Sequence, residues 1–137
     1  MINTPVLIVD DDTDDKEFLQ EVWTELKYES PLIFFEKGED VLVYLKKERI
    51  KPFLILCDVN IPGMDGFELK EKILQDDSIN YKSIPFVFWS STVSKLQIQK
   101  AYDLGGNGFF IKENNFENLK KSLIDIVNYW AKSKVPG

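Results

Sequence analysis

The chain has 137 residues, which is the length of a single domain. It carries 17 Lys and Arg residues against 23 Asp and Glu residues, a net charge of −6, so we expect no nucleic-acid partner and no membrane partner. The chain has no histidine, which excludes catalytic triads with a histidine base and zinc sites with histidine ligands. The single cysteine, Cys57, and the lack of a targeting or membrane-spanning segment favour a cytoplasmic protein.

Five short apolar runs predict the strands of one sheet, and a pattern of helical period follows each run. The predicted strands cover residues 6–9, 32–35, 53–57, 86–89 and 108–111. The predicted helices include residues 18–26, 41–45, 67–74, 96–104 and 116–130. This alternation predicts an α/β fold in which helices cover both faces of a parallel sheet. We expect residues 1–137 to form one domain, with no output domain.

Polar side chains follow four of the predicted strands. They are Asp10 and Asp11 after the first strand, Asp58 after the third, Ser90 after the fourth and Lys112 after the fifth. Ligands of an open parallel sheet bind beyond the carboxyl ends of its strands, so we expect these side chains to converge at one edge.

The chemistry of such a cluster points to phosphoryl transfer. Clustered carboxylates repel one another, and a hard divalent cation such as Mg²⁺ relieves that repulsion. A lysine and a serine hydroxyl can both hold phosphoryl oxygens. An ionised aspartate needs no general base to attack phosphorus, which suits a chain without histidine. The set therefore indicates phosphoryl transfer to an aspartate.

The order and spacing of these residues resemble a response-regulator receiver domain over nearly the whole chain. An acidic pair ends the first strand, and Asp58 is followed by a loop with the sequence Pro-Gly-Met-Asp-Gly at residues 62–66. A hydroxyl residue ends the fourth strand and a lysine ends the fifth. The layout is similar to single-domain receivers of the chemotaxis type. The resemblance implies a flavodoxin-like, doubly wound five-stranded parallel sheet in the order 2-1-3-4-5.

The resemblance also assigns an acceptor and a metal site. It implies that Asp58 accepts the phosphoryl group. Asp11, Asp58 and the main-chain carbonyl of Asn60 would hold Mg²⁺, and Asp10 would act through a metal-bound water or a hydrogen bond. Ser90 and Lys112 would contact the phosphoryl group.

The function implied by the resemblance is a two-component signalling switch that catalyses its own phosphorylation and dephosphorylation. The phosphoryl donor would be a sensor histidine kinase or a phosphotransfer protein. Phosphorylation would alter the face formed by the fourth helix, fifth strand and fifth helix, which would bind a separate downstream protein. Phe109 falls at the aromatic switch position of the family, although a plain core role for this residue is an open alternative.

Glu113 departs from the family pattern, which usually has a cis-proline after the lysine. A trans bond is expected here, because a cis bond without proline costs about 2.5–4 kcal/mol. This departure leaves open a pseudo-receiver that signals without phosphate. A haloacid-dehalogenase-like phosphatase is a further alternative, but its Asp-x-Asp-x-Thr motif is one residue out of register with Asp10–Asp14. We assign Asp12 to Asp15 to capping of the first helix.

Overall fold

The computed structural model describes residues 3–47 and 50–136. Its strands are β1 (Val6–Val9), β2 (Leu32–Phe35), β3 (Leu54–Asp58), β4 (Phe86–Ser90) and β5 (Gly108–Ile111). Its helices are α1 (Thr13–Leu26), α2 (Gly38–Lys47), α3 (Gly66–Gln75), α4 (Lys95–Asp103) and α5 (Phe116–Lys132). All strand pairs are parallel, and the sheet order β2-β1-β3-β4-β5 confirms the prediction. Within the described ranges, no helix combines the length and apolarity that crossing a bilayer requires.

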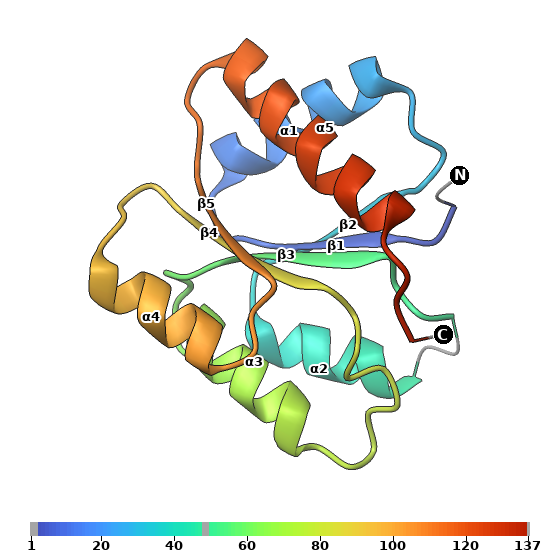
Figure 1. Ribbon diagram of the computed structural model, residues 1–137, viewed down its shortest axis with the longest axis vertical. Coiled ribbons are helices and arrows are strands. Elements are labelled where there is room, and N and C mark those ends of the chain that lie inside the picture. The colour runs from blue at the N-terminus through green and yellow to red at the C-terminus, as the bar shows by residue number, and fades with distance from the viewer. Residues whose placement is uncertain (1–2, 48–49, 137) are drawn as a thin grey trace.

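Helices cover both faces of the sheet, as predicted (Figure 1). Helices α1 and α5 pack on one face, which we call the α1/α5 face, and α2, α3 and α4 pack on the other, the α2–α4 face. Successive residues of each strand alternate between the two faces. On β1, for example, Val6 and Ile8 pack on the α1/α5 face, while Leu7 and Val9 pack on the α2–α4 face. This alternation decides which polar side chains can meet at the ends of the strands.

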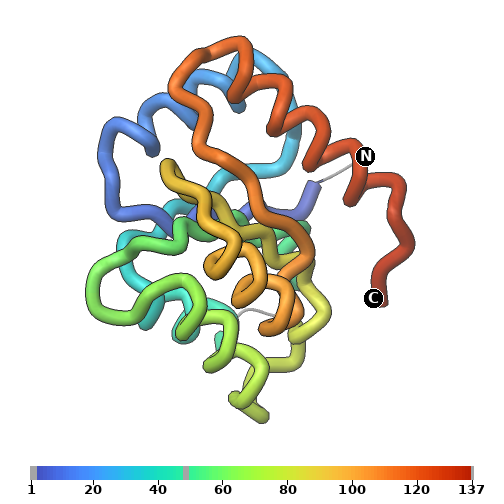
Figure 2. The backbone as a smooth tube through the Cα atoms, turned by 60° about the vertical axis from the view of Figure 1, so that its left-hand side comes forward, coloured from blue at the N-terminus to red at the C-terminus, as the bar shows by residue number. Residues whose placement is uncertain are grey.

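Helices α1 and α5 lie side by side above the sheet (Figures 1 and 2). The rings of Phe18 and Phe116 pack between them with centroids 6.0 Å apart. Helix α1 begins after Asp12, whose side chain accepts hydrogen bonds from the backbone N–H groups of Asp14 and Asp15. This N-cap fixes the first turn of α1 directly beyond the carboxyl end of β1.

Strands β3 and β4 end one residue later than the apolar runs predict. Asp58 and Ser90 are the last residues of these strands and not the first residues of the following loops. The reason is backbone pairing: Asp58 is in register with Trp89, and Ser90 with Ile111. Strand β3 also begins at Leu54, one residue later than predicted. The backbones of Asp58 and Ser90 are therefore held by the sheet itself.

Candidate functional site

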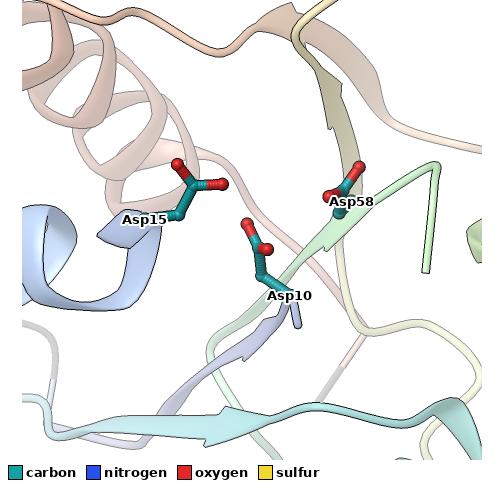
Figure 3. Close-up of side chains that lie close together, drawn as sticks. All are labelled: Asp10, Asp15 and Asp58. Carbon is teal, nitrogen blue, oxygen red and sulfur yellow. The ribbon is translucent and has the colours of Figure 1, made fainter. Parts of the chain in front are cut away.

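The ammonium group of Lys112 lies among three carboxylates at the carboxyl edge of the sheet. Its Nζ atom is 2.6 Å from Oδ2 of Asp58, 2.7 Å from Oδ2 of Asp15 and 3.0 Å from Oδ2 of Asp10. Figure 3 shows the three acids: Asp10 at the end of β1, Asp15 on α1 and Asp58 at the end of β3. The Lys112 side chain is only 13% exposed. The site therefore joins the Asp58 carboxylate to a cation that has little contact with water.

Strand alternation explains why these side chains meet. Residues two apart along a strand point to the same face of the sheet. The three polar side chains are each two residues beyond an apolar residue that packs on the α1/α5 face: Ile8 before Asp10, Leu56 before Asp58 and Phe110 before Lys112. The acids and the lysine therefore extend toward the side of the sheet that α1 covers. The first turn of α1 then brings a further carboxylate to the same point.

Burial controls the titration of the acids. Burial raises the pKa of Asp10 to about 7, although the Asp12 N–H and the Lys112 ammonium act in the opposite direction. Burial likewise raises the pKa of Asp58, and its hydrogen bond from Lys112 opposes this shift. For Lys112, burial would lower the pKa, but hydrogen bonds to Asp15 and Asp58 outweigh it and raise the pKa above its usual value. The lysine is thus a permanent cation, and it is outnumbered by the acids.

The Asp58 carboxylate is held at both oxygens. Lys112 donates to Oδ2 at 2.6 Å, and the backbone N–H of Asn60 donates to Oδ1 at 2.9 Å. Asp58 itself is buried, with 5% of its surface exposed. Asp10 is held in a similar way, because its Oδ1 accepts from the Asp12 N–H at 2.9 Å. The orientation of both carboxylates is therefore fixed by backbone groups that follow their strands.

Ser90 and Phe109 lie on the other face of the sheet from the acids. Ser90 is fully buried, and its Oγ accepts a hydrogen bond from the Thr92 N–H at 3.2 Å. Ser90 is two residues beyond Phe88 on the same strand, so both side chains point to the same face. Phe88 packs on the α2–α4 face and is in register with Phe109. Phe109 is half-buried against the same apolar cluster. The hydroxyl and the ring therefore occupy neighbouring strands on one face.

The donor set fits a hard divalent cation. Carboxylate oxygens of Asp10, Asp15 and Asp58 lie within 4.8 Å of one another, but the Lys112 ammonium already lies among them. Asp11 is exposed, and its charge raises the pKa of Asp58, so it contributes further negative charge near Asp58. An excess of carboxylates over one lysine is the oxygen-rich environment that Mg²⁺ or Mn²⁺ prefers.

The segment after β5 keeps the lysine in place without a proline. No cis peptide bond occurs in the described residues, so the bond between Lys112 and Glu113 is trans, as predicted. The backbone N–H of Lys112 donates to the Ser90 carbonyl oxygen at 2.8 Å, which continues the ladder between β4 and β5. Glu113 lines a hollow beside the site together with Asp12, Asp14 and Glu17 of the α1 segment.

Two contacts of Lys112 were not predicted from the sequence. Asp15 was assigned to capping, but Asp12 alone supplies the cap, and the Asp15 carboxylate reaches the lysine. The ring of Trp89 lies 5.1 Å from Nζ of Lys112. The sequence feature that could have indicated this contact is the position of Asp15 in the first helical turn, just after the acidic residues that follow the first strand.

Comparison with known proteins gives one consistent result. A family model described as response regulator receiver domain matches residues 6–124. The chain is 27% identical over 133 residues to the response regulator Rcp1 of Synechocystis sp., an alignment that covers 93% of this chain and 89% of Rcp1. Among solved structures, the phosphorylated cyanobacterial phytochrome response regulator RcpA is similar, with a TM-score of 0.85 and 26% identity over 99% of this chain and 100% of RcpA. The Mn²⁺-bound form of Rcp1 has a TM-score of 0.81 and 26% identity, covering 98% and 99% of the two chains.

Proposed function

The chain belongs to the response regulator receiver domain family, and from that premise we propose that it is a switch controlled by phosphorylation of Asp58. Receiver domains act as signalling switches in two-component systems and bind Mg²⁺ or Mn²⁺ in an acidic pocket. The observation that carries the proposal is the contact between Oδ2 of Asp58 and Nζ of Lys112 at 2.6 Å. It places a cation directly beside the proposed nucleophile.

In the proposed reaction an oxygen of Asp58 attacks the phosphorus of a phosphohistidine on the donor protein. A phosphorus–oxygen bond forms, the phosphorus–nitrogen bond breaks, and its electron pair returns to the donor's imidazole ring. Lys112 stays within reach of the transferred group and pairs with one of its oxygens. The protein's contribution is thus positioning and neutralisation of charge, as in other phosphoryl transfers.

We assign the metal ligands to Asp11, Asp58 and the Asn60 carbonyl, with Asp10 acting beside them. This assignment is supported by the Lys112 ammonium, which already pairs with Asp10, Asp15 and Asp58, and by the charge of Asp11, which acts on Asp58 but is not paired with the lysine. When bound, Mg²⁺ supplies positive charge that offsets the repulsion between the carboxylates and the incoming phosphoryl oxygens.

The output of the switch is proposed to be the face formed by α4, β5 and α5. Ser90 would donate its hydroxyl hydrogen to a phosphoryl oxygen and move toward Asp58. Phe109, on the neighbouring strand and the same face, would follow into the space released. A hollow lined by Phe109, Tyr102 and Tyr129 lies on this face, so a change at Phe109 would alter the surface that a separate downstream protein meets.

The alternatives differ in their predicted chemistry. The haloacid-dehalogenase-like phosphatase is not retained, because the chain belongs to the receiver family and has its fold. A pseudo-receiver that signals without phosphate keeps the same fold, and it was suggested by Glu113. The position of Lys112 on Asp58 favours an active receiver, and the experiment below separates the two.

The test is intact mass after incubation with Mg²⁺ and acetyl phosphate, with Asp58→Asn as the matched control. A gain of one phosphoryl group that is absent in the control supports the proposal. The same incubation without Mg²⁺ should give no gain. A phosphoryl group that persists in Asp58→Asn would assign the acceptor elsewhere. If no gain occurs either with acetyl phosphate or with a phosphorylated histidine-containing donor, the chain is a pseudo-receiver.

A further inference from the structure

The contact between Asp15 and Lys112 has no role in the function described so far. Oδ2 of Asp15 accepts a hydrogen bond from Nζ of Lys112 at 2.7 Å, almost as short as the contact between Lys112 and Asp58. Asp15 comes from α1, whereas Asp58 is the last residue of β3 and Asp10 directly follows β1. An ammonium group has three N–H donors, and here three carboxylates from three elements surround it.

Asp15 is well fixed in the first turn of α1. Its backbone N–H donates to Oδ1 of Asp12 at 3.2 Å, so the cap that starts the helix also sets the position of this residue. The preceding acid, Asp14, is exposed, and its backbone N–H donates to the same Asp12 oxygen. The Asp15 side chain is 29% exposed and turns inward. Of these two acids in the first turn, only Asp15 has a described contact with the lysine.

We propose that Asp15 is a positioning residue that holds the Lys112 ammonium over Asp58 during phosphoryl transfer. This inference rests on the proposed function. In the proposed reaction Asp58 becomes bonded to phosphorus, and Asp10 acts beside the metal through a metal-bound water or a hydrogen bond. Asp15 then remains as the carboxylate whose only described partner is the lysine. The lysine side chain is long and flexible, whereas Asp15 is fixed on a helix. A hydrogen bond to Asp15 would use one N–H group of the ammonium, and the other two would remain for the phosphoryl oxygens.

A competing role for Asp15 is that of a metal ligand, because its carboxylate lies within 4.8 Å of those of Asp10 and Asp58. The ammonium group of Lys112 lies 2.7 Å from Oδ2 of Asp15. A metal ion bound to all three acids would have to displace this ammonium group. The geometry therefore favours the lysine as the cation of Asp15. The two roles predict different effects of the Mg²⁺ concentration on the phosphorylation rate of an Asp15 variant.

The experiment compares Asp15→Asn with Asp14→Asn, since both remove one negative charge from the first turn of α1. At saturating Mg²⁺ and acetyl phosphate we expect the phosphorylation rate to fall about tenfold in Asp15→Asn and less than about twofold in Asp14→Asn. The apparent affinity for Mg²⁺ should stay within about twofold of the parent in both variants. Equal rates in the two variants would overturn the proposal, and a loss that high Mg²⁺ restores would assign Asp15 to the metal.

A double-mutant cycle shows whether Asp15 acts through the lysine. In the Lys112→Met background, adding Asp15→Asn should change the remaining rate by less than about twofold. A further tenfold loss would mean that Asp15 acts independently of Lys112 and would contradict the inference. Melting temperatures of all variants are compared, so that a general loss of stability is recognised.

A second measurement does not depend on phosphorylation. Reaction of the Lys112 amine with an amine-acetylating reagent, followed by peptide mass, should be several-fold faster in Asp15→Asn than in Asp14→Asn. Equal labelling would overturn the inference even if the parent were not phosphorylated. A parent that takes no phosphoryl group from acetyl phosphate or a histidine donor would instead count against the proposed function, so the two failures are distinguishable.

Discussion

The backbone N–H of Lys112 donates to the carbonyl oxygen of Ser90 at 2.8 Å, so the two proposed phosphate contacts are joined through the ladder between β4 and β5. Their side chains extend to opposite faces of the sheet. Lys112 points to the α1/α5 face, like Phe110, and Ser90 points to the α2–α4 face, like Phe88. A phosphoryl group on Asp58 would therefore be held by two groups whose backbones are directly bonded. Through this hydrogen bond, a movement of one strand end would be transmitted to the other.

Replacing Ser90 tests this arrangement. We expect Ser90→Ala to lower the initial rate of phosphorylation by about tenfold, because one hydrogen bond to the phosphoryl group is lost. Ser90→Thr should retain most of the rate, since the hydroxyl remains. Ser91→Ala, which changes the exposed neighbour, is the matched control and should leave the rate unchanged. A wild-type rate in Ser90→Ala would remove the serine from the site.

Asp10→Asn is expected to stabilise the protein when no metal is present. Burial raises the pKa of Asp10 to about 7, which means that its charged form is disfavoured in the fold. Removing that charge relieves the cost of burying it and its repulsion with Asp15, and should raise the melting temperature at pH 7 in EDTA by about 5 °C. Asp77→Asn, which changes a fully exposed acid, should give little change. A lower melting temperature in Asp10→Asn would show that its pairing with Lys112 outweighs the repulsion.

Lys70 gives a prediction for the pH dependence of stability. This lysine of α3 is 3% exposed, its Nζ lies 5.4 Å from the Phe86 ring, and within the described ranges no carboxylate forms an ion pair with it. Burial lowers its pKa below the usual 10.5. The unfolded chain therefore binds this proton more tightly, and the contribution of Lys70 to stability rises with pH between the lowered pKa and 10.5.

Lys70→Met should remove that slope. Because Met keeps the apolar stem without the charge, we expect a free energy of unfolding about 1–2 kcal/mol higher at pH 7, with the difference shrinking toward pH 10.5. Urea titrations at several pH values measure it. Lys72→Met, on an exposed position of the same helix, is the control. A gain that does not depend on pH would assign the effect to packing alone.

Gly66 provides a test of how Asp58, the proposed acceptor, is supported. A Cβ at this position would lie 2.6 Å from the carbonyl oxygen of Asp58 and 3.2 Å from Sγ of Cys57. Gly66→Ala should therefore displace the end of β3, lower stability by about 2 kcal/mol and slow phosphorylation severalfold. Thermal denaturation and intact mass report the two effects.

The control for Gly66 is Gly63→Ala. Gly63 has a φ of +77°, but the nearest atom to a Cβ there is Oε1 of Glu39 at 4.0 Å. Its replacement should reduce stability through backbone strain without slowing phosphorylation. If both variants slow the reaction equally, the loop as a whole, and not the contact with Asp58, supports the acceptor.

Much of the site could be predicted because it depends on strand order and alternation. Apolar runs mark the strands of a buried sheet, and the residues at their carboxyl ends must share one edge, which brings Asp10, Asp58 and Lys112 together. The role of each residue in the reaction stays a prediction. The exact strand ends were wrong for β3 and β4, because backbone pairing at Asp58 and Ser90 does not depend on side-chain polarity.

Asp15 could not be placed from the sequence. An acid in the first turn of a helix is favourable there whatever it contacts, so its residue type fits capping equally well. Its contact with Lys112 depends on how α1 is oriented over the end of β1, and that orientation follows from packing against α5 and the sheet. The packing of whole helices is a tertiary property that a local pattern does not contain.

Asp58 and Lys112 differ in how firmly the sheet holds them. Strand β3, which ends in Asp58, has hydrogen-bonded neighbours on both sides, β1 and β4. Strand β5, which leads into Lys112, is an edge strand paired with β4 alone. The proposed nucleophile is thus anchored in the middle of the sheet, whereas the lysine proposed to pair with its phosphoryl group follows an edge strand, where fewer hydrogen bonds must break for it to move.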